Sequence, residues 1–218
     1  MFSSNYTNRL FGRTRGRSKK KINLENYHET VNKYRFQNFN EETEYILDVG
    51  TGYGETSIFL AKHFSDKIII SCEKYIDGNI ILLKNIENNK IKNILLHNGN
   101  VYDVLESINR KYFKLIWIFF PDPWPKNRHA KRRLVTSDFL LKLHKKMKEN
   151  SEIYIATDSV IYVRFILNSI YKCKNYFIWV NQSKINLGIK DYFDIETKYY
   201  KKAINSQRKP SLFILRKL

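Results

Sequence analysis

Short apolar runs alternate with longer amphipathic runs along most of this chain. Strand-like runs occupy residues 43–50, 67–73, 94–99, 115–120, 152–158, 176–182 and 211–218. Segments with helical spacing follow the first five of them, at 54–64, 78–89, 101–110, 136–148 and 159–172. Strands that alternate with helices form the repeating unit of a parallel sheet. The pattern therefore predicts an α/β fold: a doubly wound, seven-stranded, mostly parallel sheet whose last strand is antiparallel.

Two stretches show no clear alternation. Residues 24–42 are expected to form a helix and a connector, whereas residues 183–210 are polar and lack a regular period. A length of 218 residues suits one well-buried domain, so we expect a basic N-terminal arm (1–23) and a single folded domain (24–218). The longest apolar run, LIWIFF, is far shorter than the about 18–20 residues of a membrane span. We therefore expect no membrane partner.

The two cysteines, Cys72 and Cys173, form no CxxC or CxxH pair. Such cysteines are typical of small apolar core residues in a reducing compartment. We therefore expect a cytoplasmic protein with neither a disulfide nor a metal site. The pattern leaves open whether the protein is a monomer or a homodimer.

The formal net charge of +18 is concentrated in two places. Residues 9–21 and 126–133 together hold twelve of the 39 lysines and arginines and no acid. Seven of the twelve arginines lie there, and arginine is the better bidentate ligand for phosphate. This clustering favours a polyanionic partner. For the arm, three interpretations stay open: a nucleic-acid-binding arm, a solvated basic tail and a mitochondrial transit peptide.

The first predicted strand runs into a glycine-rich turn, ILDVGTGYGE. Its glycines have the spacing GxGxG, which differs from the GxGxxG of dinucleotide-binding turns; they are Gly50, Gly52 and Gly54. Asp48, two residues upstream, suits S-adenosylmethionine, which carries an ammonium and a sulfonium. Glu73 ends the second strand, where an acid can accept hydrogen bonds from both ribose hydroxyls. Asn100 follows the third strand and is a candidate for holding adenine. A tight turn without a ligand would explain the glycines alone.

The segment IFFPDPWPKNRHAKRR includes the end of the fourth predicted strand and the loop after it, at the same sheet edge as the glycines. Three of the chain's four prolines fall within residues 121–125, around Asp122 and Trp124. Each proline fixes a φ angle, so this proline loop (residues 120–126) is stiff and holds its carboxylate in one geometry. Trp124 can either stack on a base or pack beneath the loop. The basic run after the loop would hold a phosphate backbone beside it.

The segments ILDVGTGYGE, CEKY, FFPDPWPKNRHAKRR and ATD, in this order, resemble the tRNA (guanine-N7)-methyltransferases of bacterial type. PDPWPK-x-RH-x-KRR is the most specific of these motifs, and RLFGRTRGR resembles the basic arm of that family. The resemblance covers nearly the whole chain. It implies a Rossmann-like methyltransferase fold, S-adenosylmethionine as the methyl donor, tRNA as the partner, and methylation of N7 of a guanosine in the variable loop.

The resemblance also implies roles for particular residues. Asp48, Glu73, Asn100 and Asp122 fall on cofactor positions, and Asp122 falls on the catalytic position as well. Lys126, Asp158, Thr197 and Tyr200 fall on substrate positions, and the RNA-contacting run comprises Arg128, His129, Lys131, Arg132 and Arg133. The family usually reads T-x-x-E where this chain has Thr197 and Tyr200. We expect the Tyr200 phenol to replace the acid; the alternatives are that Glu196 supplies it or that the contact is absent.

The chemistry of the target atom agrees with this pattern. Guanine N7 exposes a lone pair, so it can attack a sulfonium methyl without a general base, and the five histidines show no pairing that suggests one. Asp122 can stabilise the cationic product. Two other functions stay open. Asp122-Pro123-Trp124 partly resembles the (N/D)PP(Y/F/W) loop of RNA or DNA methyltransferases that act on exocyclic amines. A non-catalytic RNA-binding protein with a degenerate cofactor pocket would also keep the basic runs.

Overall fold

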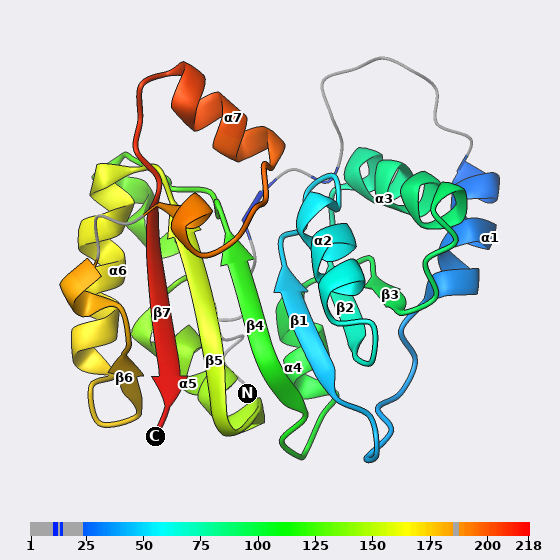
Figure 1. The fold of residues 1–218 in the computed structure, drawn as a ribbon, viewed down its shortest axis with the longest axis horizontal. Helices are drawn as coiled ribbons and strands as arrows, with labels where there is room; N and C mark the ends of the chain where they lie inside the picture. Colours follow the sequence, from blue (N-terminus) through cyan, green and yellow to red (C-terminus); the bar gives the residue numbers. More distant parts are fainter. Residues whose placement is uncertain (1–10, 13, 15–23, 185–187) are drawn as a thin grey trace, which may run out of the picture.

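The computed structural model describes residues 11–12, 14, 24–184 and 188–218, with the backbone alone for residues 24–26 and 184. Seven strands form one sheet in the order β3-β2-β1-β4-β5-β7-β6 (Figure 1). They are β1 (Tyr45–Val49), β2 (Ile68–Cys72), β3 (Ile94–His97), β4 (Phe113–Phe119), β5 (Met147–Thr157), β6 (Phe177–Trp179) and β7 (Ser211–Lys217). The first five strands pair in parallel, and β7 is antiparallel to β5 and β6. The predicted sheet is confirmed.

Helices cover both faces of the sheet (Figure 1). They are α1 (Leu24–Tyr34), α2 (Glu55–His63), α3 (Ile76–Asn88), α4 (Val101–Glu106), α5 (Ser137–Lys146), α6 (Val160–Lys172) and α7 (Lys198–Asn205). One apolar cluster joins α4, α5 and α6 to the sheet, and a second joins α1, α2 and α3 to the other face. In β4, Ile116 and Ile118 belong to the first cluster, whereas Trp117 and Phe119 belong to the second. Burial on both faces explains why this strand is apolar throughout.

The segment without a predicted element, 183–210, contains α7. Thr197 caps this helix, and its hydroxyl accepts a hydrogen bond from Tyr200 N at 3.1 Å. α7 lies beyond the carboxyl ends of β4 and β5 (Figure 1). One predicted boundary is shifted, because α5 ends at Lys146 and β5 begins at Met147 without the expected connector.

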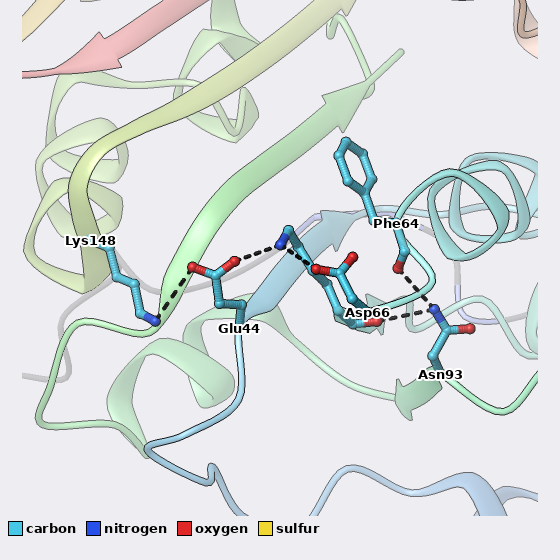
Figure 2. A network of polar contacts seen from close by, with 6 residues as sticks. Glu44, Phe64, Asp66, Asn93 and Lys148 are labelled. Carbon is cyan, nitrogen blue, oxygen red and sulfur yellow. Dashed lines mark hydrogen bonds and ion pairs between the residues drawn. The ribbon is translucent and has the colours of Figure 1, made fainter.

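Polar contacts join the amino ends of several strands (Figure 2). Glu44 Oε2 accepts a hydrogen bond from Lys67 Nζ at 2.6 Å, and Glu44 also pairs with Lys148 at 4.0 Å. The hydrogen bond from Lys67 holds the pKa of Glu44 below its ordinary value. Asn93 Nδ2 donates to the carbonyl oxygens of Phe64 and Lys67 at 3.2 and 3.0 Å. These contacts stabilise the sheet at the edge opposite the carboxyl ends.

The connections change direction between β1 and β4. β1 pairs with β2 on one side and with β4 on the other, so the loops after β1 and β4 run to opposite faces of the sheet. Open α/β sheets bind ligands at such a switch point. In this chain the two loops are residues 50–54, called the glycine turn from here on, and the proline loop.

Candidate active site

A cavity of about 1150 Å³ opens at the switch point. Six parts of the chain that are distant in sequence form its walls. The lining residues are Phe11, Gly12, Val49, Gly50, Gly52, Tyr53, Cys72, Glu73, Lys74, Tyr75, Gly99, Val101, Phe120, Pro121, Asp122, Pro123, Trp124, Pro125, Arg132, Leu134 and Tyr199. Among the predicted site residues, the cavity brings together Gly50, Gly52, Glu73, Asp122 and Arg132. Of the expected arm, residues 1–23, only Phe11, Gly12 and Thr14 lie within the described part of the chain.

The glycine turn consists of left-handed backbone. Gly50, Gly52 and Gly54 have φ angles of 73°, 59° and 82°, a region that costs a residue with a Cβ about 1–2 kcal/mol. At Gly54 a Cβ would also lie 2.4 Å from Cδ1 of Leu82 on α3. α3 approaches the turn through Gly78, where a Cβ would lie 2.0 Å from the Gly52 carbonyl oxygen. The turn can pack against α3 only because glycine occupies both contact positions.

Glu73 holds the glycine turn from the end of β2. Its Oε2 accepts a hydrogen bond from Gly52 N at 2.9 Å, and its Oε1 accepts one from Tyr75 N at 2.8 Å. Burial raises the pKa of Glu73, and these backbone bonds oppose the shift. A carboxylate has about four acceptor sites, so after a third backbone bond, from Lys74, Glu73 still keeps capacity for a donor from the cavity. This capacity suits a ribose hydroxyl.

Asp48 lies beneath the glycine turn and not on the cavity wall. Its side chain is buried, and its Oδ2 accepts hydrogen bonds from Thr56 Oγ1 and Ser57 Oγ, both at 2.6 Å. Burial raises the pKa of Asp48 to about 6. Because Thr56 and Ser57 lie in the first turn of α2, Asp48 joins β1 to the helix that follows the turn.

Asn100 caps α4 in the structure. Its Oδ1 accepts a hydrogen bond from Tyr102 N at 3.1 Å, while an oxygen of Asp103 accepts one from Asn100 N at 3.2 Å, which is a capping box. Its neighbours Gly99 and Val101 line the cavity. Asn100 therefore shapes this wall through the backbone that it fixes.

The proline loop carries Asp122 to the cavity with strained residues on both sides. Phe120 and Trp124 have φ angles of 52° and 42°, although neither is glycine. Such conformations cost about 1–3 kcal/mol each and persist only where the surroundings hold them. Phe120 N donates to the carbonyl oxygen of Ala156 in β5 at 2.8 Å. The arm also approaches this loop, because a Cβ on Gly12 would lie 3.5 Å from Asp122 Oδ2.

Arg133, which the sequence placed in the RNA-contacting run, is buried beneath the proline loop. Its residue surface is only 7% exposed. Its Nε donates to the Pro123 carbonyl oxygen and its Nη2 to the Trp124 carbonyl oxygen, both at 3.0 Å. Its guanidinium carbon lies 4.9 Å from the ring centroid of Phe165 on α6. The basic run turns inward here because the proline loop presents two carbonyl oxygens that need donors.

The rest of the basic run stays nearer the surface. Asn127–Arg132 form a short 3-10 helix in which no residue is buried. The exposed basic side chains are Lys126, Arg128 and Lys131. The Arg132 guanidinium carbon lies 4.9 Å from the Trp124 ring centroid, and the His129 ring meets the same indole edge-on at 5.7 Å. Trp124 therefore contacts side chains of its own chain, which favours packing over base stacking.

α7 places Tyr199 on the cavity wall, whereas Tyr200 packs against the apolar cluster of α1, α2 and α3. The Tyr199 ring stacks with Phe120 at a centroid distance of 6.4 Å and an interplanar angle of 25°. Burial, followed by the negative charge of Asp122, raises the pKa of Tyr199. The phenol thus stays protonated and lies near the catalytic candidate. Thr197, which is buried, uses its hydroxyl as the helix cap.

The two remaining candidate acids from the sequence, Asp158 and Glu196, are held by basic side chains. Glu196 pairs with Lys190 at 3.1 Å and with Lys201 at 3.5 Å, and it is not among the lining residues. Asp158, which follows β5, accepts a hydrogen bond from Arg208 Nε at 2.7 Å and also lies outside the lining set. The structure therefore does not bring Glu196 to the place of the family's acid.

Sequence reasoning missed Tyr199, Phe120 and Gly78. Gly78 lies inside a helical pattern, where a glycine signals a close contact but not its partner. The helix cap at Thr197 could have been read from the sequence. The cap alone does not show whether Tyr199 or Tyr200 faces the cavity, because the choice depends on how α7 packs against the rest of the domain.

Two kinds of feature are absent from the described part of the chain. No helix there is long and apolar enough to cross a bilayer. No three side chains among its histidines, cysteines and acids are grouped so as to hold a metal ion.

The chain is similar in sequence to known methyltransferases. A family model described as "Putative methyltransferase" matches residues 42–211. The tRNA (guanine-N(7)-)-methyltransferase of Wolbachia pipientis wMel is 34% identical over 193 residues, which cover 85% of this chain and 84% of that protein. The tRNA (guanine-N(7)-)-methyltransferase of Neorickettsia sennetsu is 35% identical over 164 residues, 74% of each chain.

Solved structures share the fold at low identity. An rRNA methylase from Streptococcus thermophilus has a TM-score of 0.54 at 11% identity, covering 92% of this chain and 99% of that chain. A Streptococcus mutans protein solved in complex with SAH has a TM-score of 0.52 at 12% identity, covering 91% and 99%. These likenesses identify a Rossmann-like methyltransferase fold. The matched family model and the relatives above 30% identity show that this chain belongs to the tRNA (guanine-N(7)-)-methyltransferase family.

Proposed function

We propose that this protein transfers a methyl group from S-adenosylmethionine to N7 of a guanosine in tRNA and that, as the family resemblance implies, this guanosine lies in the variable loop. One observation carries the proposal. A single cavity at the switch point holds the glycine turn and Glu73 on one side and Asp122 on the other. A cofactor site and a charge-stabilising group thus face the same space.

S-adenosylmethionine supplies an electrophilic methyl group on a sulfonium. The glycine turn presents bare backbone, and Glu73 keeps acceptor capacity for a ribose hydroxyl. Asp48 acts through the turn, because its hydrogen bonds fix the start of α2. Asn100 acts in the same way on the wall that follows β3. These residues would hold the methyl donor in the cavity that the proline loop also lines.

Asp122 is the catalytic residue in this proposal. It accepts hydrogen bonds from the guanine N1–H and amino group, which selects guanine, and its charge stabilises the cationic methylated base. N7 forms the new bond with its own lone pair, and the electrons of the broken C–S bond stay on sulfur. No proton has to move, so the cavity needs no general base. Tyr199 and Phe120 provide aromatic surface for the flat purine.

The basic surface beside the loop holds the tRNA backbone. Lys126, Arg128 and Lys131 are exposed next to the cavity, and Arg132 lines its wall. Phosphate contacts of this kind position a nucleic acid without reading its sequence. Asp158 and Thr197 are proposed to support the substrate indirectly, through the Arg208 pair and the α7 cap.

The test is methyl transfer from labelled S-adenosylmethionine to bulk tRNA, followed by reduction and aniline cleavage, which cuts the strand at N7-methylguanosine. We expect incorporation and a single cleavage position in the variable loop. Incorporation without cleavage would indicate a target other than guanine N7, such as an exocyclic amine. Binding of tRNA without incorporation would indicate a non-catalytic RNA-binding protein. Cleavage at another guanosine would refute the variable-loop assignment alone.

A further inference from the structure

One buried cation holds the backbone immediately after Asp122. The Arg133 guanidinium donates to the consecutive carbonyl oxygens of Pro123 and Trp124 at 3.0 Å each, with its opposite side on Phe165. These carbonyls belong to the part of the loop where Trp124 adopts left-handed backbone. Arg133 thus contacts the loop at its strained end, one residue from the catalytic candidate.

The anchor of this contact is α6. Phe165 lies on α6, and so does Tyr162, a fully buried residue whose hydroxyl accepts a hydrogen bond from Val135 N at 3.0 Å. α6 therefore holds the Arg133 side chain through Phe165, and it holds the backbone at Val135 through Tyr162. Arginine suits this position because its planar fork can span two carbonyl oxygens and stack on a ring, whereas a lysine ammonium is a point donor.

We infer that Arg133 is a positioning residue for methyl transfer. It links α6 to the proline loop, through the Phe165 ring on one side and two loop carbonyls on the other, and so holds the Asp122 carboxylate in its reactive geometry. This inference rests on the proposed function. Arg133 is not among the residues that line the cavity, so it acts through the loop. A displacement of about 1 Å at a reacting group can cost about 100-fold in rate. The effect should therefore fall on kcat.

The experiment compares Arg133→Gln and Arg133→Lys with Arg216→Gln, a charge-matched control. Arg216 pairs with Glu152 at 2.8 Å at the other end of the sheet. For each protein, kcat, the KM for tRNA, the salt dependence of tRNA binding, S-adenosylmethionine affinity and circular dichroism are measured. We expect kcat to fall about 100-fold in Arg133→Gln and about ten-fold in Arg133→Lys. Cofactor affinity, tRNA affinity and the salt slope should stay within about three-fold of wild type, and Arg216→Gln should match wild type.

Three outcomes would overturn the inference. Weaker tRNA binding, a salt slope reduced by about one and an unchanged kcat would make Arg133 a phosphate contact. Wild-type kcat in folded Arg133→Gln would show that the loop holds its shape without the fork. Loss of the circular dichroism spectrum and of cofactor binding in both variants would assign Arg133 to the stability of the whole domain. Failure of the proposed function is a separate result, because the wild-type protein itself would then leave guanine N7 of tRNA unmethylated.

Discussion

The glycine turn and the proline loop line the same cavity, follow adjacent strands and both contain left-handed backbone, yet they reach that backbone differently. Each lies over a buried charged side chain, Asp48 under the turn and Arg133 under the loop. In the turn the left-handed residues are glycines, which adopt such conformations at little energetic cost. In the loop they are Phe120 and Trp124, for which they are strained.

The comparison separates two ways of fixing a loop conformation. One loop is fixed by its own residues, and the other is fixed by contacts with distant segments. The glycine turn carries its shape in its own residues, and its buried carboxylate bonds only hydroxyls eight and nine residues away. Prolines restrict the other loop but do not create its left-handed ends. Those ends depend on hydrogen bonds to Ala156 and from Arg133, which lie on other elements. Substitutions in the two loops should therefore fail in different ways.

The largest expected effect is at the reactive end of the proline loop. Asp122→Ala should lower kcat by about 100-fold or more, the range for loss of a preorganised electrostatic group, and Asp122→Asn should recover little because it lacks the charge. Methyl transfer to tRNA under saturating cofactor measures this. Asp194→Ala is the control, because the Asp194 side chain is 97% exposed and lies outside the cavity lining. Wild-type turnover by Asp122→Ala would reduce Asp122 to a turn residue.

The buried acid under the glycine turn should make stability depend on pH. Burial raises the pKa of Asp48 from 3.8 to about 6, so the folded protein binds its proton more tightly than the unfolded chain does. This residue's contribution is therefore favourable below about pH 4 and is lost as pH rises to about 6. The free energy of unfolding of Asp48→Asn, relative to wild type, should rise by up to about 3 kcal/mol over that interval. Urea titrations at pH 4, 5, 6 and 7 measure it, and a flat difference would contradict the shifted pKa.

Adding one methyl group should damage the glycine turn locally. Gly54→Ala places a Cβ at φ 82° and 2.4 Å from Leu82, so we expect a loss of about 1–3 kcal/mol in stability and weaker cofactor binding. The matched control is Gly188→Ala, where φ is −78° and the nearest atom to the new Cβ lies 3.8 Å away. Thermal melts and calorimetry compare the two. Equal effects would mean that the conformation of the turn is not what makes Gly54 necessary.

The register of α7 can be tested with its two consecutive tyrosines. Tyr199→Leu should raise the KM for tRNA by roughly five- to 150-fold, because stacking on a base contributes about 1–3 kcal/mol. Tyr200→Phe should stay near wild type, because Tyr200 packs against an apolar cluster. Steady-state kinetics on tRNA decide between them. The reverse order of effects would show that Tyr200, as first expected from the family pattern, faces the substrate.

The smallest effects should come from the exposed cations after the proline loop. Arg128→Ala and Lys131→Ala should each weaken tRNA binding by a few-fold and reduce the salt slope by about 0.7–0.9, the value for one phosphate contact. Filter binding between 50 and 200 mM salt measures both. Cofactor affinity should not change in either variant. A slope equal to that of wild type would place the tRNA on another face.

The sequence alone was sufficient for the sheet and for several residues that line the cavity. Alternating apolar runs predicted the seven-stranded, mostly parallel sheet, because the strand period of two residues and the helix period of 3.6 are local properties of the chain. The glycine spacing and Glu73 indicated the sheet edge where the cavity opens, since the carboxyl ends of parallel strands share one edge. The proline-framed Asp122 was equally visible. Each of these features is encoded within about ten residues.

The tertiary structure alone decided where individual side chains point. Arg132 and Arg133 are chemically identical neighbours, yet one lines the cavity and the other bonds the loop from beneath, because α6 offers Phe165 on that side only to Arg133. Tyr199 lines the cavity and Tyr200 packs against an apolar cluster, and the packing of α7 decides which tyrosine lies where. Asp48 and Asn100 lie near the cavity, but their side chains bond neighbours in the chain. Asp48 accepts from the Thr56 hydroxyl, and Asn100 accepts from the Tyr102 backbone. Which partner a polar side chain finds depends on contacts between distant segments, and no local pattern records those contacts.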